Sequence, residues 1–89
     1  MVSSQQIRAA RALLGISAAE LAERSAVSHR TLQRFEAQDG IPESRSGNLE
    51  AIERVLTEVG ILFIGDPLTS PGVQLRIKGA GYFEGKSGI

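Results

Sequence analysis

Two short helical patterns joined by only three residues occupy residues 17–36, and this arrangement limits the available folds more than any other feature of the sequence. The first pattern opens with Ser17 and Glu20 at the spacing of a capping box. In that motif the serine hydroxyl accepts a backbone amide and the glutamate reaches back to the serine amide. The helix that follows, residues 18 to about 24, has two turns and is too short to be stable alone. The segment therefore predicts a helix that forms only when it packs against its neighbours.

The second pattern begins at Ser28, a second N-cap, directly after the gap of residues 25–27. Hydrophobic residues flank each cap as a staple, namely Ile16 with Leu21 and Val27 with Leu32. The helical period places Leu32, Phe35 and Glu36 on one side of this helix. The other side carries His29, Arg30, Gln33, Arg34 and Ala37. The pattern thus predicts a helix with a buried inner face and an outer face of exposed basic and hydrogen-bonding side chains.

An amphipathic helix precedes these two patterns. The residues of its inward stripe are Ile7, Ala10, Arg11 and Leu14. Ser3 or Ser4 is expected as its N-cap, and Gly15 is expected to end it. Arg11 lies on the inward stripe, and Glu36 lies at the edge of the inward face of its own helix. Either charge alone would cost roughly 3–5 kcal/mol in the interior, so we expect a salt bridge between them. Arg8 is expected to be solvated.

The remainder of the chain predicts a fourth helix and a β-hairpin. Residues 38–47 read as a loop, and Ser46 or Asn48 is expected to cap the helix that follows. The inward stripe of that helix is Leu49, Ile52, Val55, Leu56 and Val59, ended by Gly60. Residues 61–64 and 73–77 predict two strands, and the connection between them suits an antiparallel hairpin.

Three segments follow from these patterns. The helical domain is expected over residues 1–60 and the hairpin, as a dimerisation element, over residues 61–78. Residues 79–89 have no periodicity and are expected to form a mobile tail or a segment ordered by a partner. We expect the hairpin to pack on the fourth helix and to pair with a second copy, because an isolated two-stranded ribbon is marginal in water.

Composition and charge distribution limit the classes of function that the chain can have. The 89 residues carry ten basic and ten acidic side chains, but residues 1–36 sum to +2, residues 37–66 to −4 and residues 67–89 to +2. One surface of the folded chain can therefore be basic while another is acidic, although the net charge is zero. The chain has no cysteine and one histidine, which argues against disulfides and zinc. No apolar run approaches the length of a spanning helix, so a cytoplasmic protein is expected.

Catalysis and cofactor binding find no support in the sequence. There is no G-x-S-x-G motif and no thiol nucleophile, and the one histidine has no carboxylate at an obvious spacing to orient it. Gly79, Gly81 and Gly85 miss the dinucleotide-binding fingerprint by one residue. We expect neither an enzyme nor a cofactor.

The segment ALLGISAAELAERSAVSHRTLQRFE, with Arg11 and Glu36, resembles the phage repressor and Cro type of helix-turn-helix domain, also called the XRE type. The resemblance implies a mainly α fold, a repressor-like bundle of four to five helices that contains a helix-turn-helix, here with a C-terminal β-hairpin. It also implies a dimer on a symmetric double-stranded DNA operator. Two positions depart from the family pattern: Ala18 stands where a phosphate-binding glutamine is usual, and Ala26 where glycine is favoured in the turn.

The same resemblance places the DNA contacts. Base reading in the major groove would fall on Ser28, His29, Arg30 and Arg34. An arginine fork can donate two hydrogen bonds to guanine, worth roughly 1–3 kcal/mol against a wrong base. Phosphate contacts are expected from the Ala18 backbone amide, Gln33, Arg45, Ser46 and Asn48.

The function expected from these residues is transcriptional regulation by sequence-specific DNA binding, with repression as the expected outcome. Two alternatives stay open at this point. The scaffold can serve mainly as a protein-interaction module, as the zero net charge and the missing glutamine permit. It can also be an antitoxin whose C-terminal segment binds a toxin.

Overall fold

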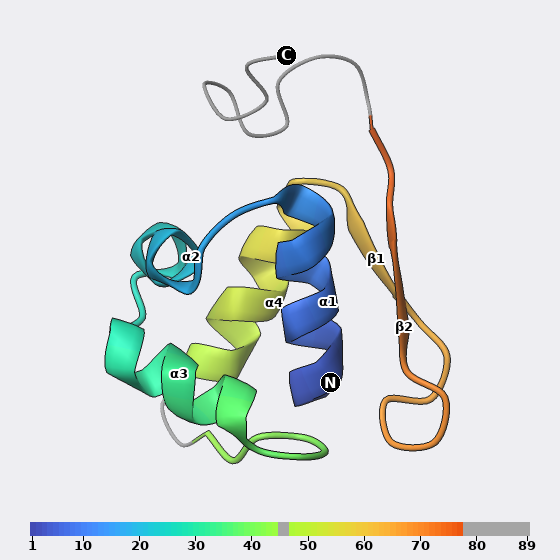
Figure 1. The fold of residues 1–89 in the computed structure, drawn as a ribbon, viewed down its shortest axis with the longest axis horizontal. Helices are drawn as coiled ribbons and strands as arrows, with labels where there is room; N and C mark the ends of the chain where they lie inside the picture. Colours follow the sequence, from blue (N-terminus) through green and yellow to red (C-terminus); the bar gives the residue numbers. More distant parts are fainter. Residues whose placement is uncertain (45–46, 78–89) are drawn as a thin grey trace.

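The chain folds into four helices and one β-hairpin in the computed structural model, which describes residues 1–44 and 47–77. The elements in chain order are α1 (Ser4–Leu14), α2 (Ala18–Ser25), α3 (His29–Ala37), α4 (Asn48–Glu58), β1 (Ile61–Ile64) and β2 (Gly72–Leu75). Figure 1 shows α2 and α3 on one side of the molecule and the hairpin on the other, with α1 and α4 between them. The mainly α fold with a C-terminal hairpin is confirmed.

Serine caps define the first three helices. Ser3 is the N-cap of α1, and Gln6 completes a capping box by accepting from the Ser3 amide at 3.0 Å. The Ser17 hydroxyl accepts from the Glu20 amide at 3.1 Å, and the Glu20 carboxylate forms an ion pair with Arg24 at 3.3 Å. Gly15 ends α1 in the left-handed conformation (φ 69°), where glycine avoids the steric penalty of a Cβ.

The start of α4 differs from the expectation. Gly47 is the N-cap, with φ 74°, and Asn48 is already the first helical residue, so the prediction that Asn48 caps this helix is wrong. The Leu49 amide instead donates to the hydroxyl of Ser44 at 3.3 Å. The other expected cap, Ser46, lies outside the described residues, as do Arg45 and the tail.

An aliphatic core lies between the helices and the inner face of the hairpin. Its fully buried large side chains include Ile7, Leu21, Leu32, Phe35, Ile52, Leu56 and Ile61. They come from all four helices and from β1, so each predicted inward stripe contributes to one common core. Packing in this core supplies the stability that the short helices α2 and α3 lack by themselves.

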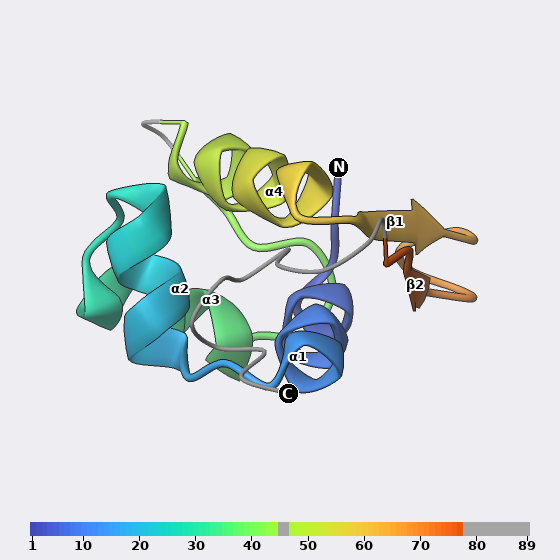
Figure 2. The same cartoon turned by 90° about the horizontal axis from the view of Figure 1, so that it is seen from above.

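The hairpin is antiparallel and shorter than expected. Ile61 pairs with Leu75 and Ile64 with Gly72. The second strand ends at Leu75, whereas the sequence predicted it to continue to residue 77, and the side chain of Ile77 is largely exposed. The hairpin also does more than pack on α4: β2 lies along α1, while β1 contacts α4 (Figure 2).

Candidate nucleic-acid interface

The turn between α2 and α3 is built from backbone hydrogen bonds and two caps. Ser25 is the last residue of α2, so it belongs to the helix and not to the predicted gap. Ala26 takes the left-handed conformation with φ 57° and ψ 36°, and the Val27 amide then donates to the Ala22 carbonyl at 3.0 Å. The Ser28 hydroxyl accepts from the Thr31 amide at 3.0 Å and starts α3. The tight connection predicted from the two caps is therefore present.

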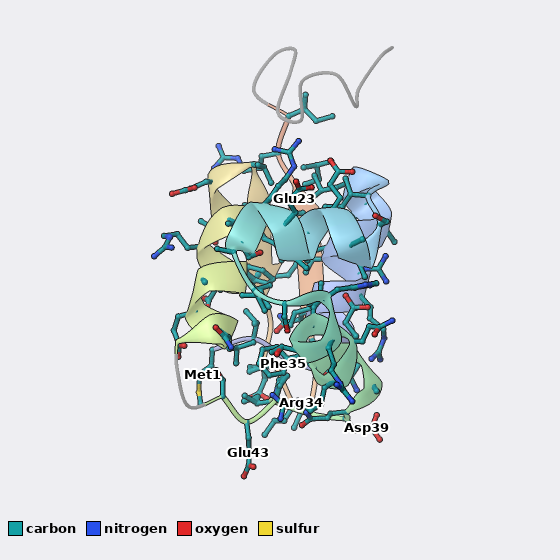
Figure 3. The ribbon with its side chains drawn as sticks, turned by 90° about the vertical axis from the view of Figure 1, so that its left-hand side faces the viewer. Met1, Glu23, Arg34, Phe35, Asp39 and Glu43 are labelled. Atoms are coloured by element: carbon teal, nitrogen blue, oxygen red, sulfur yellow. The ribbon has the colours of Figure 1, made fainter. Side chains whose placement is uncertain are left out.

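The inner and outer faces of α3 are those that the sequence predicted. Leu32 and Phe35 are fully buried, and the side chains on the other side are exposed, including Ser28, His29, Arg30, Gln33 and Arg34. The Arg34 guanidinium carbon lies 5.6 Å from the centre of the Phe35 ring, within cation–π range. Figure 3 views the molecule from the side on which α2 and α3 lie, with Arg34 toward the lower part of α3.

The predicted salt bridge between α1 and α3 is formed and is bidentate. Arg11 Nε lies 2.8 Å from Glu36 Oε2, and its Nη2 lies 2.8 Å from Oε1. A third guanidinium hydrogen bond reaches the Ile16 carbonyl at 3.2 Å. The hydrogen bond to Glu36 raises the pKa of Arg11 above its ordinary value, so the guanidinium stays protonated.

Two further residues of α1 hold the C-terminal end of α3, and the sequence did not predict either contact. The Ser4 hydroxyl donates to the Phe35 carbonyl at 2.6 Å, although Ser4 was considered only as a cap. Arg8, expected to be solvated, is half-buried and donates to the Glu36 carbonyl. These contacts occupy the carbonyls that the end of a helix leaves without partners. Together with the Arg11–Glu36 pair they fix the orientation of α3 relative to α1.

The expected phosphate-binding residues are distributed around this unit. Ala18 is the first residue of α2, where backbone amides point out of the helix toward solvent and attract anions. Gln33 is exposed on α3, and Asn48 is partly exposed at the start of α4. Arg45 and Ser46 lie outside the described residues. The structure therefore places three of the five expected phosphate contacts and leaves their role a prediction.

Acidic side chains also lie on this side of the molecule. Glu23 is exposed on α2, and Asp39 is exposed just after α3 (Figure 3). Glu20 is partly neutralised by its ion pair with Arg24. The cations on the outer face of α3 are therefore bordered by negative charge. This charge would weaken the binding of any polyanion that does not place its phosphates between the carboxylates.

A buried amide missed by the sequence reasoning joins α1 to the hairpin. Gln6 is only 2% exposed, and its Nε2 donates to the carbonyls of Gly72 at 2.9 Å and Ile64 at 3.3 Å. Its Oε1 is the acceptor of the capping box at Ser3. The signal available in sequence was the S-x-x-Q spacing of that box, which indicates a local cap but not the distant partners.

Comparison with known proteins agrees with this geometry. The model of the helix-turn-helix family matches residues 7–61, which include most of α1, the whole of α2, α3 and α4, the turn and the first residue of β1. No curated protein matches the chain. Among the residues that the structure describes, no helix combines the length and apolar character needed to cross a membrane.

The match spans more than half of the chain, and the two capped helices that it covers have the inner and outer faces of a DNA-reading unit. Both the family match and the geometry lead to the same assignment. The chain belongs to the XRE-type helix-turn-helix family, and its kind of function is that of a DNA-binding transcription regulator.

Proposed function

We propose that the protein is a repressor that binds a specific double-stranded DNA sequence as a homodimer, with α3 in the major groove. The observation that carries this proposal is the outer face of α3, where exposed cationic and hydrogen-bonding side chains stand on a helix whose inner face is fully buried. Repression requires only that the bound dimer occupy its operator.

Base reading is assigned to Ser28, His29, Arg30 and Arg34. Arg30 is exposed in the first turn of α3, the part of a recognition helix that lies deepest in the groove. The Ser28 hydroxyl already accepts from the Thr31 amide, so it would contact DNA while it caps the helix. Arg34 lies one turn further along and would reach bases or the adjacent backbone.

Phosphate binding is assigned to the Ala18 amide, Gln33, Arg45, Ser46 and Asn48. Ala18 lies at the start of α2 and Asn48 at the start of α4, and both positions offer backbone amides and a positive helix end. Ala18 lacks the side chain that a glutamine would provide, so this contact rests on the backbone alone. We therefore expect a strong dependence of affinity on salt, with the arginines supplying most of the phosphate neutralisation.

A homodimer is proposed because one short helix reads only a few base pairs. Two copies related by a twofold axis engage half-sites about 34 Å apart or at multiples of that spacing. The hairpin lies across the molecule from α3, so a contact made by the hairpin leaves the recognition helix free (Figure 1). Dimerisation and DNA binding can then occur together.

The proposal is tested by selecting binding sites from a randomised duplex pool with the purified full chain at about 50 mM salt. We expect an inverted repeat, and a reporter placed behind it should be transcribed less when the protein is present. The Arg30→Ala variant should lose preference at one base position in each half-site, at a cost of roughly 1–3 kcal/mol.

Arg76→Ala is the matched control, because Arg76 is exposed and follows β2 on the hairpin side. It should keep the selected sequence unchanged. The proposal fails if no duplex is enriched, or if Arg30→Ala and the control retain the same base preferences. Enrichment of a site that increases transcription of the reporter would refute repression but not DNA binding.

A further inference from the structure

The outer edge of β2 presents backbone groups that no described residue uses. The Arg76 amide donates to the Gly60 carbonyl at 2.8 Å, which fixes the alternation of the antiparallel ladder. Val73 and Leu75, which face Phe63 and Ile61, are then at non-hydrogen-bonded positions. Their N–H and C=O groups point away from β1, and no residue of the described chain bonds to them. In the described chain β1 borders β2 along one edge only, and Figure 2 shows α1 beside β2 on the core side of the hairpin.

We propose that β2 pairs antiparallel with β2 of a second copy about a twofold axis at Gln74. In this register Val73 of one copy faces Leu75 of the other, and each such pair exchanges two backbone hydrogen bonds. The edge is thus complementary to itself, as an isologous interface requires. This interface would form the homodimer of the proposed function, and its relevance to DNA binding rests on that function.

Side chains favour the same pairing. Val73 and Leu75 are only half-buried, and both lie on the inner face of the hairpin with the core. Pairing places Val73 of one copy next to Leu75 of the other on that face and covers apolar surface that is now exposed. On the outer face the two Gln74 side chains become direct neighbours, and carboxamides can hydrogen-bond to each other.

Neighbouring registers are less favourable. An axis at Val73 would place Leu75 opposite Pro71, which has no amide hydrogen to donate. An axis at Arg76 would place two arginines directly opposite each other, and like charges at such positions are destabilising. An axis at Leu75 would require Ile77, which lies beyond the end of β2. Only the axis at Gln74 uses groups that all lie within the strand.

Disulfide trapping tests this register, because the chain has no cysteine of its own. Paired residues at a non-hydrogen-bonded antiparallel position have Cα atoms about 4.5 Å apart, within the range that a disulfide bridges. Gln74→Cys should therefore form a covalent dimer under mild oxidation. Arg76→Cys is the matched control, since it is exposed on the same face and its counterpart would lie about 13 Å away along the strands.

We expect Gln74→Cys to cross-link at least about tenfold faster than Arg76→Cys, because only the former meets the distance requirement. Sedimentation of the unmodified chain at micromolar concentration should also show a dimer. Equal cross-linking rates, faster cross-linking of Arg76→Cys, or a monomer in sedimentation with no trapping would overturn the proposal. Operator binding by the same samples is measured separately. Binding without trapping refutes this interface alone, whereas trapping without binding supports the interface and refutes the proposed function.

Discussion

Ala26 occupies a backbone conformation that favours glycine, so the substitution Ala26→Gly should stabilise the protein. Its φ of 57° and ψ of 36° lie in the left-handed region, where a Cβ costs roughly 1–2 kcal/mol. Glycine removes that cost but makes the unfolded chain more flexible, which offsets about 0.4–1 kcal/mol. The net expectation for Ala26→Gly is a gain of about 0.5–1 kcal/mol in the free energy of unfolding.

A gain of that size should raise the melting temperature by about 2–8 °C in a domain of this length. Thermal and urea denaturation followed by circular dichroism measure it. Ala9→Gly is the control, because Ala9 is exposed in the middle of α1 and glycine there should destabilise by about 1 kcal/mol. The reasoning is refuted if Ala26→Gly destabilises the protein as Ala9→Gly does, because backbone strain at the turn would then be absent.

Three further predictions concern contacts that hold the fold together. Arg11→Met leaves the Glu36 carboxylate unpaired at 11% exposure and should cost about 3 kcal/mol in urea denaturation, and adding Glu36→Leu should recover most of that loss. Gln6→Leu leaves two hairpin carbonyls without their side-chain donor and should cost about 1–3 kcal/mol, whereas Gln5→Leu on the exposed side of α1 should be nearly neutral. Hydrogen bonds from two backbone amides lower the pKa of Asp66 below its ordinary value of 3.8, so its stabilising contribution is present above that value and is lost as pH falls through the folded-state pKa. The melting-temperature difference between the wild type and Asp66→Ala should accordingly be full at about pH 6 and disappear in strong acid.

Local signals account for what could be predicted from sequence. A serine cap and the residue three positions later form a unit that the sequence displays directly, so the starts of α2 and α3 were correct. The Arg11–Glu36 pair was also predictable, because a charged residue on an inward stripe needs an opposite charge on a facing stripe. The exposed face of α3 followed from the helical period alone.

Errors arose where a polar group found its partner outside the local pattern. At the start of α4, the N-cap is Gly47 in the left-handed conformation, and the Leu49 amide donates to the hydroxyl of Ser44, five positions earlier in the chain. Cap rules that count from the first helical residue cannot identify that donor and acceptor. At the end of β2, the alternation of apolar residues continues to Ile77, but that side chain is 63% exposed, and the strand ends two residues earlier.

The contacts of α1 show why sequence alone could not describe the candidate site completely. Ser4, Arg8 and Arg11 hold the end of α3, while Gln6 on the same helix holds both strands of the hairpin. Gln6 lies 58 and 66 residues from its two hairpin partners, so no local spacing reveals these bonds. Because all four side chains project from one helix, α1 fixes the position of the recognition helix relative to the hairpin. A dimer made through the hairpin would therefore set the distance between its two α3 helices through α1, and the spacing of the operator half-sites would follow from that distance.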